Sequence, residues 1–109
     1  MLDWANYRRQ LGENVKELGK LSRDTVKGYA ALSNAGRQAD VLGAKTRELI
    51  ALAVAVTVRC DGCIATHVEA AKKHGATREE IAEALGVAIA VNAGAALVYS
   101  ARVLDAHGA

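Results

Sequence analysis

The chain has 109 residues, a length that fits a single domain spanning 1–109. Its composition, 51% hydrophobic and 24% charged, excludes a disordered polypeptide. The formal net charge is only +2, and basic and acidic residues are interspersed without a basic stripe, which argues against a nucleic-acid partner. Proline is absent and alanine is abundant, so we expect an all-α fold.

Two helices are expected in the first third of the chain. Apolar side chains recur three and four residues apart from Trp4 to Leu18, a pattern typical of one helical face. Asp3 is placed to cap the start of this helix. Gly19 to Ser22 separates it from the second helix, which Ser22 begins. The stretch from Gly36 to Gly43 is expected to be a loop.

The middle of the chain predicts a third and a fourth helix. The third runs from about Ala44 to Arg59 and is apolar almost all the way round, which is typical of a helix buried on every side. The turn formers Asp61 and Gly62 interrupt the helical pattern, and the fourth helix carries residues Cys63 to His74. Asp61 is the expected N-cap of that helix, and Gly75 ends it.

The last third predicts one or two more helices, for a total of five or six. Thr77 and Glu80 have the spacing of a capping box. We expect Asn92-Ala93-Gly94 to bend or split the helix that follows, and the final helix to end near Asp105. Between Gly86 and Tyr99 nearly all side chains are small and apolar. That stretch indicates a central core helix, a subunit interface, or both on different faces.

The longest apolar runs are Leu49 to Val58 and Gly86 to Val91, and neither approaches the roughly 18 residues that span a bilayer. The N-terminus also lacks the pattern of a signal peptide. We therefore expect a cytoplasmic protein without a membrane partner. In a compartment that keeps thiols reduced, two cysteines three residues apart indicate redox chemistry or metal binding.

Cys60, Cys63 and His67 form the chemically distinctive part of the sequence. Cys63 is expected in the first turn of a helix, where free backbone N–H groups and the helix dipole lower the pKa of a thiol. His67 follows four residues later, on the same face, and can accept the thiol proton or hold the thiolate. Glu48, twelve residues before Cys60, is a third candidate that would orient the histidine and take a proton from it. Spacing alone leaves open whether Glu48 reaches the others.

Each of these residues also has a plainer interpretation. Free cysteines are good small core residues, and Glu48 can be a simple first-turn helix acid. Zinc normally takes four ligands, whereas only the two cysteines and His67 are locally available. His74 is roughly 10 Å from His67 by helix rise, too far for both to hold one ion without rearrangement. His74 is expected at the surface near the end of its helix, and His107 in the tail. We expect neither a metal nor a cofactor.

Three segments together carry a resemblance to a known family: Lys45 to Leu52, Cys60-x-x-Cys63-x-x-x-His67, and Gly75 to Ala84. They resemble the alkylhydroperoxidase-D-like branch of the carboxymuconolactone decarboxylase family. The resemblance extends from about Trp4 to Asp105. It implies an all-helical domain that assembles into trimers or hexamers. It also implies a thiol–disulfide active site for peroxide reduction, recharged in some members by dihydrolipoyl groups on a partner protein.

By position, the resemblance makes Cys60 and Cys63 the redox pair, and Glu48 and His67 the proton relay. The hydroperoxidases have a second histidine just before the second cysteine, where this chain has Gly62. The expected function is therefore a thiol–disulfide oxidoreductase that reduces peroxides or disulfides, in which Cys63 attacks and Cys60 resolves. The alternatives are a cofactor-free lyase like the decarboxylases and a structural or zinc-binding helical oligomer.

Overall fold

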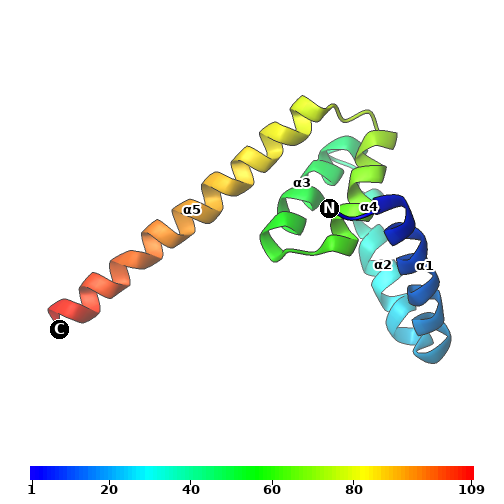
Figure 1. Ribbon diagram of the computed structural model, residues 1–109, viewed down its shortest axis with the longest axis horizontal. Coiled ribbons are helices and arrows are strands. Elements are labelled where there is room, and N and C mark those ends of the chain that lie inside the picture. The colour runs from blue at the N-terminus through cyan, green and yellow to red at the C-terminus, as the bar shows by residue number, and fades with distance from the viewer.

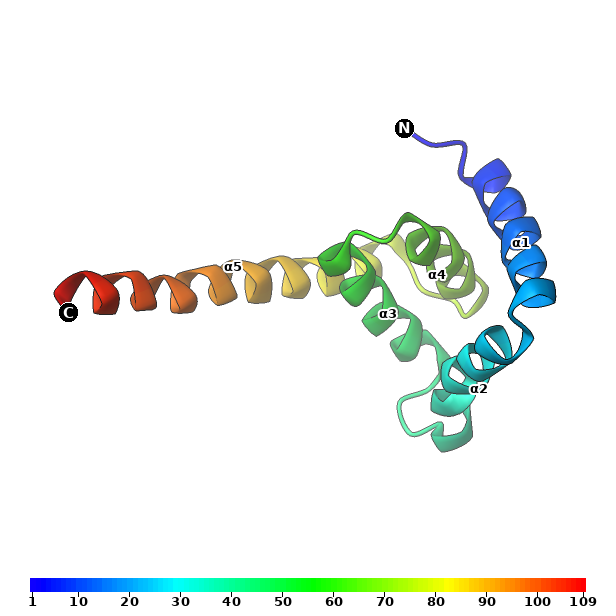
Figure 2. The same ribbon diagram turned by 90° about the horizontal axis from the view of Figure 1, so that it is seen from below.

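The computed structural model describes residues 1–109 as five α-helices and no β-strand, which confirms the all-α expectation. The helices are α1 (Trp4–Leu21), α2 (Arg23–Ala39), α3 (Ala44–Val58), α4 (Asp61–Lys73) and α5 (Arg78–Gly108). Helices α1 and α2 lie beside the α3–α4 hairpin, and α5 projects from the other side as a long rod (Figures 1 and 2). The radius of gyration is 17.7 Å, against about 13 Å for a compact chain of this length.

Helices α1 and α2 form an arm with a sharp bend at Ser22. The Asp3 side chain accepts a hydrogen bond from the backbone N–H of Asn6 and so caps α1 as expected. The expected loop from Gly36 to Gly43 is wrong in its first half, because α2 continues to Ala39. Arg37, Gln38 and Ala39 are good helix formers. The helix ends only where Asp40 takes the left-handed conformation, at φ 46°.

The small core of the chain lies where α3 meets α4 and α5. Its buried side chains are Leu52 and Ala55 on α3, Ala65 and Ala71 on α4, and Ala88 on α5. The prediction that α3 is buried on every side is wrong for this single chain, since Val54 and Val58 are 55% and 63% exposed. Alanine at the contact points lets the helix axes approach closely, which fixes how α3 and α4 present their polar side chains.

Helix α5 is continuous over 31 residues, so the expected bend at residues 92–94 is wrong. The Asn92 side chain donates to the carbonyl oxygen of Ala88, one turn earlier, and to Oγ1 of Thr57 on α3. Asn92 therefore links α5 to α3 instead of breaking the helix. The capping box of Thr77 and Glu80 is present in both directions, as predicted. The helix also extends past Asp105 to Gly108.

Only Ala88 of α5 is buried, so the interpretation of this segment as a core helix is wrong within one chain. Its apolar length was also underestimated, because an 18-residue window of α5 has a mean hydropathy of 1.9. By length and composition alone α5 meets the criterion for crossing a membrane. Apolar helices at the core of soluble proteins meet the same criterion.

Candidate redox site

The candidate redox site is built at the turn between α3 and α4. Helix α3 ends where Arg59 adopts a left-handed conformation, at φ 57°. The backbone N–H of Cys60 then returns to the carbonyl oxygen of Ala55 at 3.0 Å. This reversal brings the end of α3 against the beginning of α4. The two helices are therefore antiparallel neighbours, and a side chain near the start of α3 can face one in the middle of α4.

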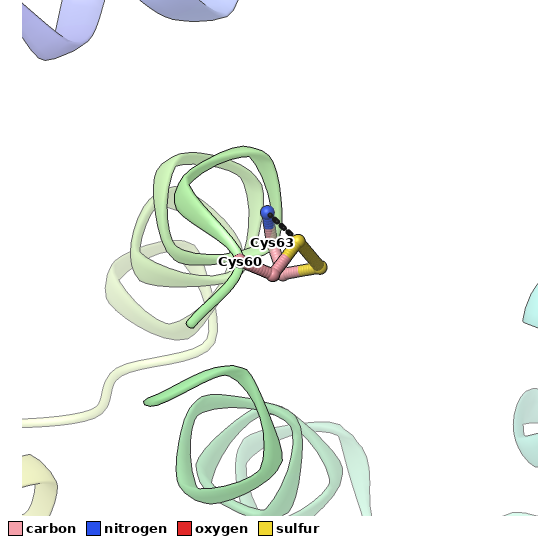
Figure 3. The surroundings of a disulfide bond; sticks show 2 residues. All are labelled: Cys60 and Cys63. Carbon is pink, nitrogen blue, oxygen red and sulfur yellow. Dashed lines mark hydrogen bonds between the residues drawn. A yellow bond between two sulfur atoms is a disulfide. The ribbon is translucent and has the colours of Figure 1, made fainter. Parts of the chain in front are cut away.

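Cys60 and Cys63 form a disulfide at the start of α4, with their Cα atoms 5.2 Å apart (Figure 3). Cys60, and not Asp61 as predicted, is the N-cap residue: its backbone is extended and its Sγ accepts the N–H of Cys63 at 3.1 Å. Asp61 is instead the first helical residue, where its negative charge interacts favourably with the positive end of the helix dipole. Cys63 lies in the first turn, as predicted.

His67 and Glu48 are joined across the two helices. The Nδ1 atom of His67 lies 2.6 Å from Oε2 of Glu48. Both side chains are partly shielded, at 30% and 19% exposure respectively. The predicted approach of Glu48 is therefore present in the structure. With Nδ1–H donated to the carboxylate, the Nε2 atom of His67 is the nitrogen that can accept or supply a proton on the face that His67 shares with Cys63.

Gly62 occupies the position between the cysteines that the hydroperoxidases fill with histidine, and the structure gives a steric reason for the glycine. A Cβ atom at Gly62 would lie 3.0 Å from Cδ2 of Leu11 on α1. The φ of Gly62 is not positive, so its backbone conformation does not require glycine. Leu11 was not predicted to be a neighbour of the site. Its only signal was its place on the apolar face of α1.

A second ion pair involves Lys45, one helical turn before Glu48 on α3. Lys45 Nζ lies 2.8 Å from Oε2 of Glu80, which ties the first turn of α3 to the first turn of α5. The hydrogen bond from Lys45, followed by that from the backbone N–H of Thr77, lowers the pKa of Glu80 below its ordinary value of 4.5. These contacts hold the two helix starts together, near the end of α3 that carries Glu48.

The remaining histidines lie away from the site. His74 caps the C-terminal end of α4 and is exposed, as predicted, and His107 is exposed near the end of α5. No group of three or more His, Cys, Asp or Glu side chains is arranged to hold a metal ion. A groove of about 360 Å³ between α1 and α4 is lined by other residues: Trp4, Arg8, Ile64, Ala65, Val68, Glu69 and Lys72.

Comparison with known proteins places this helical frame in a family. Residues 23–106 match the model of the carboxymuconolactone decarboxylase family, a span that includes all four candidate site residues. The chain belongs to the carboxymuconolactone decarboxylase family. A solved relative has the same fold: the apo form of a carboxymuconolactone decarboxylase family protein from Legionella pneumophila. Its TM-score is 0.77 with 34% identity, and the match covers 94% of this chain and 92% of that one.

Two further relatives of this carboxymuconolactone decarboxylase family member match over most of their length. An uncharacterized protein of Haemophilus influenzae is 50% identical over 105 residues, covering 96% of this chain and 93% of that protein. Uncharacterized protein 4 in the cox locus of Paracoccus denitrificans is 39% identical over 90 residues, covering 80% and 81%. Their similarity supports the fold and the family and does not identify a reaction.

Proposed function

We propose that this protein is a thiol–disulfide oxidoreductase of the alkylhydroperoxidase type, which reduces a peroxide or a disulfide with Cys60 and Cys63. The observation that carries the proposal is the 2.6 Å contact between His67 and Glu48, with His67 one helical turn after Cys63. A packing cysteine pair would need no histidine on its face and no carboxylate bound to that histidine. Within the family, the redox cysteine pair supports the alkylhydroperoxidase-D-like branch.

In the oxidative half of the proposed reaction, the thiolate of Cys63 attacks one oxygen of a peroxide. The oxygen–oxygen bond breaks, Cys63 becomes a sulfenic acid, and the leaving alkoxide takes a proton from His67. The thiol of Cys60 then attacks the sulfur of Cys63, which forms the disulfide and releases water. The substrate gains two electrons and the two thiols lose them. With a disulfide substrate, the first product is a mixed disulfide that Cys60 resolves in the same way.

In the reductive half, an external dithiol returns the two electrons. One of its thiolates attacks the Cys60–Cys63 disulfide, and its second thiol completes the exchange and leaves as a cyclic disulfide. A dihydrolipoyl group on a partner protein is a reductant of this kind. Figure 3 shows the disulfide at the start of α4, and both cysteines are partly exposed, so such a group can reach them. We propose that the enzyme works in the cytoplasm as a homo-oligomer, without a cofactor.

A cofactor-free lyase is the second candidate, favoured by the family match itself. In that function Glu48 and His67 would move a proton on a carboxylated substrate, and the cysteines would be dispensable. Two serine variants separate the candidates. Cys60→Ser and Cys63→Ser should each abolish peroxide-dependent oxidation of an added dithiol, with His74→Ala, an exposed change on the same helix, as the control. Full turnover in either serine variant would overturn the oxidoreductase.

A further inference from the structure

Arg59 lies directly before the cysteine pair, in a backbone conformation that its side chain does not favour. Its φ of 57° and ψ of 54° place it in the left-handed region at the end of α3. A β-carbon makes that region costly for most residues, so a helix that ends there usually has glycine, or else asparagine, at this position. The chain therefore has arginine where the backbone favours glycine, one residue before Cys60.

The other three residues of positive φ each have an explanation within the fold. Gly43 and Gly75 lack the side chain that would be strained. Asp40 belongs to a residue type that is enriched in this region, and its carboxylate also binds Arg47 at 2.7 Å. The side chain of Arg59, by contrast, is exposed and forms no ion pair within the chain.

The dipole of α3 explains a positive charge near this end of the helix, but not the position of Arg59. A cation interacts favourably with the C-terminal end of a helix anywhere in the last turn. The last turn of α3 has no basic residue, although a lysine or arginine there would carry the same charge on a relaxed helical backbone. An unfavourable conformation kept for an exposed side chain indicates a role outside the fold.

The place of Arg59 in the chain determines what its side chain can reach. Its Cα atom is about 3.8 Å from that of Cys60, so the guanidinium group can enter the space around the disulfide. Asp61, the acidic residue on the other side of Cys60, forms no ion pair with Arg59. The guanidinium group is therefore available to an outside anion, and it binds a carboxylate through two parallel hydrogen bonds.

We propose that Arg59 is a specificity-determining residue of the redox site, which binds a carboxylate on the dithiol or disulfide that exchanges with Cys60 and Cys63. The inference rests on the proposed oxidoreductase function and adds the charge of the co-substrate. During reduction, the dithiol gives two electrons and two protons to the cysteine pair and leaves as a cyclic disulfide. The carboxylate takes no part in the exchange, and its contact with Arg59 holds the sulfurs of the dithiol near the Cys60–Cys63 bond.

Dihydrolipoate and dihydrolipoamide test the proposal as a matched pair, because they differ only in a carboxylate against a neutral amide. Each is mixed with oxidised full-length protein, and the two-thiol form is trapped by alkylation and followed by mass. At low salt the wild type should be reduced about fivefold faster by dihydrolipoate, the effect of one exposed charge pair. The preference should disappear in Arg59→Gln, remain in Arg59→Lys and shrink in about 0.5 M potassium chloride.

Arg37→Gln is the control, since it removes an exposed arginine at the end of α2, near the opposite end of α3, and it should keep the preference. Equal rates for the two dithiols in the wild type, or the same loss for both in Arg59→Gln, would overturn the proposal. The assay contains no peroxide, so a lack of peroxidase turnover would count only against the proposed peroxide reduction. A disulfide that neither dithiol opens would contradict the oxidoreductase and this proposal together.

Arg59→Gly supplies a second measurement, of stability. Because glycine favours the left-handed region, this variant should melt at a higher temperature than the wild type while it loses the preference for dihydrolipoate. A lower melting temperature would show that the fold itself requires the arginine, and would overturn the proposal.

Discussion

The imidazole of His67 lies 2.6 Å from the carboxylate of Glu48, although nineteen residues separate them in the sequence. The contact depends on the tight reversal between α3 and α4, which places the first turns of α3 beside the middle of α4. A partly shielded carboxylate in this position fixes the orientation and tautomer of the histidine, and it stabilises the imidazolium that forms when the histidine takes a proton.

The proposed proton relay predicts unequal losses of activity when His67 and Glu48 are replaced. His67→Ala should reduce the peroxidase rate about 100-fold, since it removes the general acid and base. Glu48→Gln should cause a smaller loss, because glutamine keeps a hydrogen-bond acceptor for Nδ1–H but not the charge. Both should move the pH profile of thiol alkylation in the reduced protein towards higher pH. The His74→Ala variant serves as the control, and unchanged alkylation profiles in both relay variants would remove Glu48 and His67 from the mechanism.

The close approach of Leu11 to Gly62 predicts an energetic coupling between α1 and the redox turn. In an exposed helix, Gly→Ala stabilises by about 1 kcal/mol. At Gly62 that gain should be lost, because the new methyl group meets Leu11. A double-mutant cycle with Leu11→Ala, followed by chemical unfolding, should give a coupling of about 1 kcal/mol in favour of the double variant. If the two changes in unfolding free energy are strictly additive, Leu11 does not restrict the side chain at position 62.

The close approach of Leu11 also affects position 62, where the hydroperoxidases have a histidine and this chain has glycine. Gly62→His alone should unfold at a lower temperature than the wild type, because the ring needs the space that Leu11 fills. In a Leu11→Ala background the histidine should be accommodated, and we expect a higher peroxidase rate than in Leu11→Ala itself. The comparison uses thermal melts together with initial rates. Equal destabilisation in both backgrounds would show that something other than Leu11 requires glycine here.

The interactions of Glu80 predict that part of the free energy of unfolding depends on pH. Its pKa is lowered by the hydrogen bonds from Lys45 and from the backbone of Thr77. A lowered folded-state pKa means that this stabilisation is fully present above pH 4.5 and is lost as the pH falls through the depressed value. Glu80→Gln keeps the capping hydrogen bond but loses the charge. Its melting temperature should fall below that of the wild type at pH 7, and the gap should close in acid. A gap that persists in acid would contradict the ionic origin.

Local signals in the sequence were enough for much of the fold. Thr77 with Glu80, Asp3 before α1, and Gly75 with its φ of 83° after α4 all act within a few residues, so each could be predicted from its neighbours. The end of α2 was harder, because a single Gly36 can be tolerated inside a helix when good helix formers follow it. Asn92 was misjudged for a different reason: its side chain is satisfied by Thr57, on another helix.

The features of the site also differ in how far the sequence alone could predict them. The spacing of Cys60, Cys63 and His67 along one helix could be predicted, because helical geometry alone places them. The contact of Glu48 required the turn between two helices, and the fit of Leu11 against Gly62 required the packing of α1 on α4. The burial of α3 and α5 was misjudged because an apolar composition indicates that a surface will be covered, but not whether the same chain covers it.

The central claim is tested most directly by the intact mass of the fully reduced protein after exposure to one equivalent of hydrogen peroxide. The wild type should lose about 2 Da through a Cys60–Cys63 disulfide, whereas Cys60→Ser should gain about 16 Da as a sulfenic acid on Cys63. The Cys63→Ser variant should stay unmodified on the same timescale. Reduced wild-type protein that keeps both thiols under these conditions would contradict the account, as would a Cys63→Ser variant that oxidises as fast as Cys60→Ser.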